Sequence, residues 1–290
     1  MQISVIIPCW NEAERVGHQL AALTHQKVDF EWEVVVVDNG STDETRARAQ
    51  RFLGLLPNLR IIMADREKGV SFARNEGARV AHGRWLVFVD ADDTVSGGWL
   101  KAMAEALEAH PVVGSRFEGR WLNPGKPNRP LGQQQAIETL WYPPYLKHAG
   151  GSGLGVWREA HERVGGFDQG LKYLEDADYC IRLQLEGYSI HFEPSALIHI
   201  RYKAGRSNTF RQARSWARAN TTLYRRYGLS RLATRSAWRT YAQGLWNVVR
   251  STRKLRSERA RAVFAWQTGW YLGLLEGAVM NRVAPVAQQA

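Results

Sequence analysis

The chain has 290 residues, of which 44% are hydrophobic and 23% charged. This composition excludes a disordered chain and is typical of a globular protein with a full core. The net charge of +11 is uneven: residues 1–200 hold 21 basic and 26 acidic residues, whereas residues 201–290 hold 18 basic and only two acidic ones. Two cysteines, Cys9 and Cys180, are too few for a disulfide framework. Because no basic segment precedes the first apolar run, we expect no secretion signal and a cytoplasmic setting.

Strand and helix patterns alternate over the first 95 residues. Buried apolar runs predict four strands, at residues 2–7, 33–37, 59–63 and 85–89. Helices are predicted to open at Asn11 and Asp43, and a third to run over residues 69–81. This alternation predicts an α/β fold with a mostly parallel sheet flanked by helices. The strands end at polar segments, so a nucleotide site is expected at the carboxyl edge of the sheet.

The fourth predicted strand begins at Trp85 and ends in three carboxylates, Asp90, Asp92 and Asp93. Clustered carboxylates repel one another and lose hydration, so a cation or a hydrogen-bonding ligand is needed to offset that cost. Hard oxygen ligands suit Mg²⁺ or Mn²⁺. Two interpretations stay open at this point: a metal site, or a solvated turn in which Asp93 and Thr94 cap the next helix.

The second half of the chain is less regular. Residues 119–144 include five prolines and predict an irregular excursion with a short helix around 133–140. Regular patterns then return: a helix around 158–164, a helix over Glu175 to Leu185, and a strand over 196–200 that contains His199.

Six short motifs follow one another in order: Val5–Glu12, Val35–Asp43, Ala73–Gly77, Phe88–Asp93, Gly166–Asp168 and Glu175–Asp178. Together they resemble the family 2 glycosyltransferases of the GT-A fold, over residues 3 to roughly 227. The resemblance implies inverting transfer of a sugar from a nucleotide-sugar donor of the UDP, GDP or dTDP type, with a divalent metal, Mn²⁺ or Mg²⁺. A nicotinamide enzyme is disfavoured because no GxGxxG follows the first strand.

The same resemblance implies roles for single residues at the donor site. The donor-binding residues it implies are Pro8, Trp10, Glu12 and Asp38 for the base pocket, Arg74 for the diphosphate and Asp90 for the ribose. For Trp10 the alternative is an aromatic that simply packs at a strand end. For Arg74 it is a solvated surface arginine.

Metal and catalytic roles are implied in the same way. Asp92 matches the residue that binds the metal, and this metal bridges the two phosphates of the donor. His199 matches a further metal ligand of some relatives. A structural histidine paired in the core is the alternative for His199. Asp176 matches the general base, which inverting transfer needs on the face opposite the leaving group. Asp178 is expected to support the helix N-terminus or to pair with Arg182.

We expect a GT-A catalytic domain over residues 1–227, with a donor-binding half (1–95) and an acceptor half (96–227). A basic, tryptophan-rich helical extension follows over 228–290. Within it, six residues recur at three- and four-residue steps: Trp238, Tyr241, Ala242, Leu245, Trp246 and Val249. This spacing predicts an amphipathic helix able to lie in a lipid interface. The alternative is an ordinary helical cap on the catalytic domain.

A second apolar segment follows the amphipathic one. Gly269, Gly273 and Gly277 fall four residues apart and predict close docking of a helix on a neighbour, or a helix half-sunk in the interface. Glu276 argues against a membrane span.

Two functions are therefore weighed. The first is an inverting, metal-dependent glycosyltransferase that acts on a glycan or lipid-linked acceptor, peripherally at the inner face of the plasma membrane. The alternative is a non-catalytic nucleotide-binding protein whose basic tail binds nucleic acid or anionic membrane. Nucleic acid is the less favoured partner, because the apolar residues of the tail sit at helical spacing instead of lining a basic groove.

Overall fold

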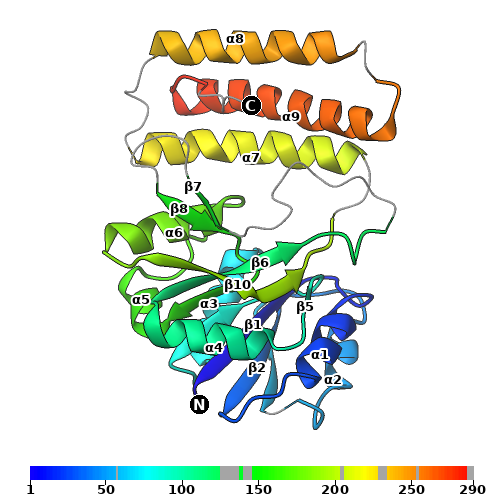
Figure 1. Ribbon diagram of the computed structural model, residues 1–290, viewed down its shortest axis with the longest axis vertical. Coiled ribbons are helices and arrows are strands. Elements are labelled where there is room, and N and C mark those ends of the chain that lie inside the picture. Colours follow the sequence, from blue (N-terminus) through cyan, green and yellow to red (C-terminus); the bar gives the residue numbers. More distant parts are fainter. Residues whose placement is uncertain are drawn as a thin grey trace. The chain divides into compact units, whose positions relative to one another are not determined.

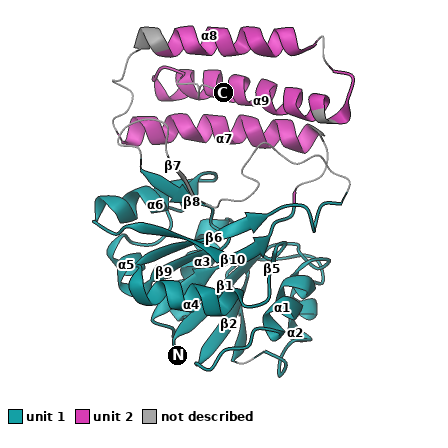
Figure 2. Cartoon of the chain, in the orientation of Figure 1, with its two compact units in different colours: residues 1–140, 146–201 teal, residues 141–145, 202–290 magenta. Residues whose placement is uncertain are grey.

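The computed structural model describes residues 1–56, 58–124, 137–139, 146–202, 206–227, 234–252 and 255–285. Contacts divide the chain into two compact units (Figure 2). Unit 1 comprises residues 1–140 and 146–201, and unit 2 comprises residues 141–145 and 202–290. The predicted domain boundary at residue 227 stays a prediction. The division by contacts falls earlier, so that helix α7 (Arg206–Arg226) lies in unit 2.

Unit 1 is built on one mixed sheet (Figure 1), whose order in the described part is β3-β2-β1-β4-β9-β6-β10-β5. Its strands are β1 (Ile3–Cys9), β2 (Trp32–Asp38), β3 (Leu59–Met63), β4 (Trp85–Phe88), β5 (Thr94–Val95), β6 (Val112–Glu118), β9 (Leu154–Trp157) and β10 (Ile190–His199). Strands β3, β2, β1 and β4 are parallel, which confirms the predicted parallel sheet. Strand β9 runs antiparallel to both its neighbours, and β10 is parallel to β6.

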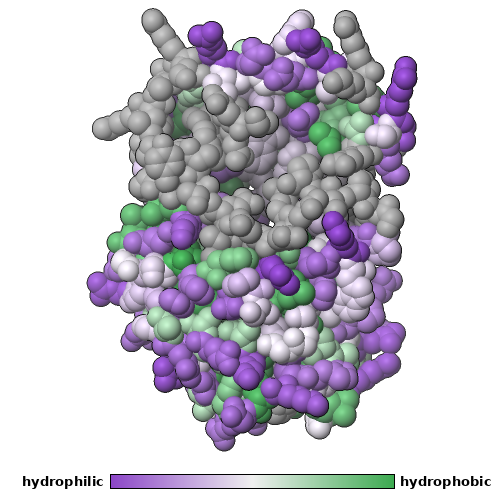
Figure 3. Space-filling view, viewed as in Figure 1, coloured by the Kyte–Doolittle hydropathy of each residue, from purple (hydrophilic) through white to green (hydrophobic). Residues whose placement is uncertain are grey.

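Helices cover both faces of this sheet. They are α1 (Val16–Thr24), α2 (Thr45–Gln50), α3 (Val70–Val80), α4 (Trp99–Ala109), α5 (Arg158–Arg163) and α6 (Glu175–Leu185). Alternate side chains of β1 enter opposite cores: Ile3 and Val5 pack with α1 and α4, and Ile6 packs with α3 and α6. Hydrophilic side chains cover much of the visible surface of unit 1 (Figure 3). Both cysteines are buried and free, as predicted.

The third helix lies unusually close to the sheet. A Cβ atom on Gly77 would stand 2.5 Å from Cγ2 of Ile6 and 2.9 Å from Cγ2 of Val37. Only glycine permits this approach without a shift of the core. Arg74, one turn earlier on the same face of α3, is thereby held against the sheet.

Several local predictions need correction. Helix α1 begins at Val16 instead of Asn11, whose φ of 56° lies in the left-handed region. Residues Ile137–Thr139 form strand β7, which pairs with β8 (Lys147–Ala149), so the helix predicted around 133–140 is wrong there. The rest of that predicted helix, and most of the excursion, lie outside the described residues. Strand β6 and the first half of β10 were not predicted, because Gly114 to Arg116 interrupt the apolar run of β6 and Pro194 interrupts β10.

Unit 2 contains helices α7 (Arg206–Arg226), α8 (Thr234–Ser251) and α9 (Glu258–Asn281), with α9 between the other two (Figure 1). A Cβ on Gly269 or Gly273 would overlap a backbone carbonyl of α7, and one on Gly277 would overlap Thr221 Oγ1. The predicted small-residue face therefore docks on a neighbouring helix, as expected. Within the described ranges, no helix combines the length and the apolar character that crossing a bilayer requires.

Helix α8 is amphipathic, as predicted, but it divides its apolar residues between two faces. Tyr241 is buried, and its hydroxyl donates a hydrogen bond to the carbonyl of Tyr271 on α9, at 3.1 Å. The large hydrophobic side chains that α8 exposes are Trp238, Leu245, Trp246 and Val249. The helix thus packs on α9 through one face and presents an apolar stripe on another.

Candidate functional site

The loops after β1 and β2 are bonded to each other at the carboxyl edge of the sheet. The strand register places Cys9 beside Asp38. Asn11 links the loops, because its N–H donates to Ser41 Oγ at 3.0 Å and its Oδ1 accepts the N–H of Thr42 at 2.8 Å. Asp38 is buried and accepts the N–H of Ser41 at 2.9 Å. The predicted base-pocket residues therefore lie together at one edge.

The side chains of this pocket differ in exposure. Trp10 is 58% exposed, which contradicts the alternative of simple packing at the strand end. Pro8 and Glu12 are half-buried, and Glu12 pairs with Arg15 at 2.9 Å. Contact of these residues with a donor base stays a prediction.

The buried thiol of Cys9 lies near carboxylates from three elements at this edge. Burial raises the pKa of Cys9 well above its usual value, and the negative charges of Asp38, Glu12 and Asp90 raise it further. The loop after β1, the end of β2 and the turn after β4 therefore each place a carboxylate near Cys9.

The acidic turn after β4 is not a solvated loop. In the described part of the chain, oxygen atoms of Asp90, Asp92 and Asp93 all lie within 4.8 Å of one another. Asp93 is buried: its Oδ2 accepts the hydroxyl of Ser152 at 2.7 Å, and its Oδ1 accepts the N–H of Arg201 at 3.0 Å. Ser152 Oγ in turn accepts the N–H of Asp90 at 3.1 Å. The acidic turn is therefore bonded to the glycine-rich loop at 150–153 and to the end of β10.

Its electrostatics reflect this burial. Desolvation raises the pKa of Asp93 well above its usual value, repulsion from Asp90 and Asp92 adds to the rise, and the bonds from Ser152 and Arg201 oppose it. Helix α4 is preceded by Gly98, so Asp93 and Thr94 do not cap it. The interpretation of this turn as a helix cap is wrong.

Arg74 bridges the acidic turn and the start of α6. Only 3% of its side chain is exposed, which excludes the solvated surface arginine. Its Nη2 lies 2.9 Å from Asp90 Oδ1 and its Nη1 lies 3.0 Å from Glu175 Oε1. Its guanidinium also lies 5.1 Å from the ring centre of Phe167. Burial disfavours the charge, but the carboxylates of Asp90, Glu175 and Asp176 outweigh it and raise the pKa of Arg74.

The predicted base lies beside this bridge. Asp176 is half-buried in the first turn of α6, and its Oδ2 accepts the N–H of Gly151 at 3.0 Å. A Cβ on Gly151 would stand 2.5 Å from the guanidinium nitrogens of Arg74, so the loop passes tightly over the arginine. Burial, with repulsion from Asp176, raises the pKa of Glu175 to about 7, against the opposing charge of Arg74. Asp178 pairs with Arg182 at 2.8 Å, as predicted.

His199 lies near the turn but bonds elsewhere. The register of β10 and β5 sets it opposite Thr94. Its Nδ1 lies 2.9 Å from Glu118 Oε2, and its ring meets that of Trp121 edge-on, with centroids 4.5 Å apart. The metal-capable cluster found among the described residues consists of the three aspartates and does not include His199. Its role as a metal ligand stays a prediction, while the pairing with Glu118 fits the structural alternative.

Sequence reasoning missed three residues that shape the site: Ser152, Glu175 and Glu118. The glycine-rich run around Ser152 and the position of Glu175 beside Asp176 were visible signals. Neither shows that Ser152 bonds to an aspartate 59 positions away or that Glu175 bonds to an arginine 101 positions away.

The donor set fits a hard divalent cation. All three aspartates offer carboxylate oxygen, the ligand that Mg²⁺ and Mn²⁺ prefer. Asp90 and Asp93 already have positively polarised partners, which lets them stay close together.

Comparison with known proteins identifies the family. Residues 4–165 match the model for glycosyl transferase family 2. The chain belongs to this family. Residues 145–284 match the model for glycosyl transferase family group 2.

Relatives of this family-2 chain carry glycosyltransferase names. It is 37% identical over 126 residues to glycosyltransferase AglE of Haloferax volcanii, a match that covers 42% of this chain and 41% of AglE. It is 26% identical over 256 residues to the uncharacterized glycosyltransferase EpsJ of Bacillus subtilis, covering 79% of this chain and 71% of EpsJ. The AglE match and that to Bacillus subtilis YfnE span only 41% and 23% of those proteins.

Solved structures confirm the predicted GT-A fold. The mannosyltransferase PcManGT from Pyrobaculum calidifontis, in complex with GDP-Man and Mn²⁺, has a TM-score of 0.66 at 20% identity, over 95% of this chain and 86% of that one. S. aureus TarS 1–349, in complex with UDP-GlcNAc, has a TM-score of 0.57 at 18% identity, over 98% and 93%.

The raised pKa of Glu175 predicts a pH-dependent stability. The pKa of a glutamate in an unfolded chain is about 4.3, whereas that of Glu175 in the folded chain is about 7. Its contribution to stability is therefore complete below about pH 4 and is lost as pH rises through about 7. As the pH rises from 5 to 8, the unfolding free energy of the parent chain should fall by about 2 kcal/mol more than that of Glu175→Gln.

Urea titration in metal-free buffer at both pH values measures this difference. Glu186→Gln, the same substitution at the exposed end of α6, serves as the control and should follow the parent chain. A parent-like pH dependence in Glu175→Gln would show that its surroundings do not raise the pKa of Glu175.

Proposed function

We propose that the chain is an inverting, metal-dependent glycosyltransferase that moves a sugar from a nucleotide-sugar donor to a glycan or lipid-linked acceptor. The observation that carries this proposal is the meeting of the acidic turn, Arg74 and Asp176 at the carboxyl edge of the sheet. Membership of family 2 supports the reaction class. Structures of the same fold that hold UDP-GlcNAc or GDP-Man support a nucleotide-sugar donor.

The donor is proposed to lie across the ends of β1, β2 and β4. Asp38 would accept a hydrogen bond from the base, with Pro8, Trp10 and Glu12 around it, and Asp90 would bind the ribose. Arg74, a buried positive charge that pairs with Asp90, would lie beside the diphosphate. Asp92, with Asp90 and Asp93 next to it and His199 as the further predicted ligand, would hold Mn²⁺ or Mg²⁺. That cation, when bound, neutralises charge on the leaving diphosphate.

Asp176 is proposed as the general base. Its carboxylate is fixed by the N–H of Gly151 and by its place in the first turn of α6, where the helix dipole favours negative charge. From there it would accept the proton of the acceptor hydroxyl as that oxygen attacks the anomeric carbon. Glu175, with its pKa raised to about 7, bears little charge at acidic pH and so limits repulsion against Asp176 there.

Two substitutions test this assignment. Asp92→Ala should lower nucleoside diphosphate release from the preferred donor at least 100-fold, because charge on the leaving group is no longer neutralised. Asp176→Asn should lower kcat roughly 100- to 10,000-fold with little change in the KM for the donor, because only proton removal is lost. The assay follows diphosphate release from a panel of UDP-, GDP- and dTDP-sugars with Mn²⁺ or Mg²⁺.

Asp29→Asn, at an exposed position, is the matched control and should retain full activity. Undiminished turnover in Asp92→Ala would sink the metal assignment. Absence of turnover with every donor in the parent chain would favour the non-catalytic alternative.

We also propose that unit 2 holds the enzyme peripherally at the inner, cytoplasmic face of the plasma membrane. Residues 201–290 carry 18 basic and two acidic side chains, and α8 exposes an apolar stripe that includes two tryptophans, Trp238 and Trp246. A basic residue near an anionic leaflet contributes about 1 kcal/mol, and the stripe adds apolar burial.

Cosedimentation with vesicles tests this location. The full chain should bind vesicles that contain phosphatidylserine, and Trp246→Ser should weaken this binding several-fold because α8 then buries less apolar surface in the interface. Ala242→Ser, on the same exposed face, is the control. Salt-sensitive binding to single-stranded oligonucleotides, without vesicle binding, would support the nucleic-acid alternative instead.

A further inference from the structure

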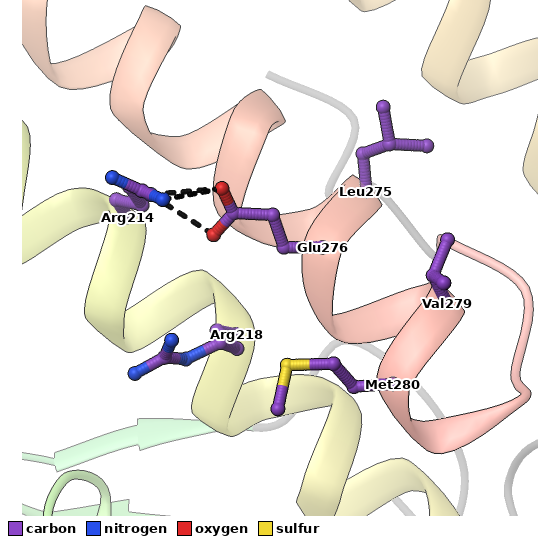
Figure 4. A pocket seen from close by; sticks show the side chains of 6 residues that line it. All are labelled: Arg214, Arg218, Leu275, Glu276, Val279 and Met280. Atoms are coloured by element: carbon purple, nitrogen blue, oxygen red, sulfur yellow. Dashed lines mark hydrogen bonds and ion pairs between the residues drawn. The ribbon is translucent and has the colours of Figure 1, made fainter.

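A hollow of about 410 Å³ lies between α7 and α9, within unit 2. Its lining side chains are Arg214, Arg218, Leu275, Glu276, Val279 and Met280. Figure 4 shows the two arginines extending from α7 and the other four residues from α9. Neither the base pocket nor the acidic turn contributes a residue to it.

One wall of the hollow is apolar and open to solvent. Val279 is 73% exposed, Met280 65% and Leu275 37%. Leu272 lies one helical turn before Leu275, is 38% exposed and extends the same face of α9. Moving such side chains out of water and against a hydrocarbon partner is favourable.

The other wall is cationic. Arg214 is already paired, because its Nε lies 3.0 and 2.9 Å from the two carboxylate oxygens of Glu276 (Figure 4). That ion pair offsets the charge of Glu276, the one carboxylate that lines the hollow. Arg218 is exposed, and within the described ranges no carboxylate lies at ion-pair distance from it. The hollow therefore presents one guanidinium with room for an anionic partner.

Close helix packing brings the two walls together. Gly277 lets α9 approach until a Cβ there would stand 3.0 Å from Cα of Arg218. The backbone of Arg218 therefore lies close to α9. A charge recognised here must be joined directly to a hydrocarbon group.

We propose that this hollow binds a phosphate-bearing membrane lipid, with the phosphate on Arg218 and the hydrocarbon chain against Leu275, Val279 and Met280. A guanidinium bonds a phosphate through two parallel N–H groups. A free phosphate would leave the apolar wall in water, and a neutral lipid would leave Arg218 without a partner. The inference deepens the proposed membrane location and rests on it, since it names the lipid group that one site of unit 2 recognises.

The test measures binding of dioctanoyl phosphatidic acid, in monomeric form, to the full chain by calorimetry. Arg218→Ala should weaken binding about tenfold. Arg211→Ala removes the same charge from an exposed position of α7 outside the hollow, and should change affinity less than twofold. Val279→Ser should weaken binding about fivefold, whereas Val249→Ser, on the exposed stripe of α8, should not.

Glycerol 3-phosphate, which is the head group without chains, should bind at least tenfold more weakly than the lipid. If Arg218→Ala and Arg211→Ala lowered the affinity for the lipid equally, binding would reflect general charge attraction, and the proposal would be overturned. Equal affinity for glycerol 3-phosphate, or no binding of the lipid by the parent chain, would overturn it as well. Donor turnover is measured separately on the parent chain, so a failure of the sugar-transfer proposal is seen in that assay and not in these comparisons.

Discussion

The site depends on one buried ion-pair bridge, in which Arg74 bonds to Asp90 and Glu175 at the same time. A guanidinium that is 3% exposed needs anionic partners to offset lost hydration. The carboxylates need the arginine in return, because Asp90, Asp93, Glu175 and Asp176 otherwise repel across a poorly hydrated space. Removing one partner would leave an uncompensated charge inside the protein.

This bridge connects the two halves of the proposed reaction. Asp90 belongs to the turn that would hold the metal and the donor, whereas Glu175 is adjacent to the proposed base Asp176. The loop at 150–153 joins the same halves, since Gly151 bonds to Asp176 and Ser152 bonds to both Asp90 and Asp93. Donor position and base position are therefore set by shared contacts, as transfer between two substrates requires.

The sequence predicts those parts of the structure that local pattern decides. Strand β3 and helix α6 have the predicted bounds, because a continuous apolar run and a 3.6-residue period each fix an element without help from distant residues. The placement of Asp38 and Asp90 at one edge followed from the predicted parallel strands, whereas the role of Asp176 came from the family resemblance alone. The bond from Ser152 to Asp93, and the insertion of β9 between β4 and β6, depend on tertiary packing that no short stretch encodes. Tyr241 shows the same limit, since its helical spacing matches that of exposed Trp238 while α9 buries it.

The most direct test is a crystal structure with Mn²⁺ and the nucleoside diphosphate of the preferred donor. The account predicts anomalous density for manganese between Asp92 and the diphosphate, with the base against Asp38 and Arg74 still bonded to Asp90 and Glu175. Manganese bound away from the acidic turn, or a diphosphate that leaves this edge of the sheet empty, would contradict it.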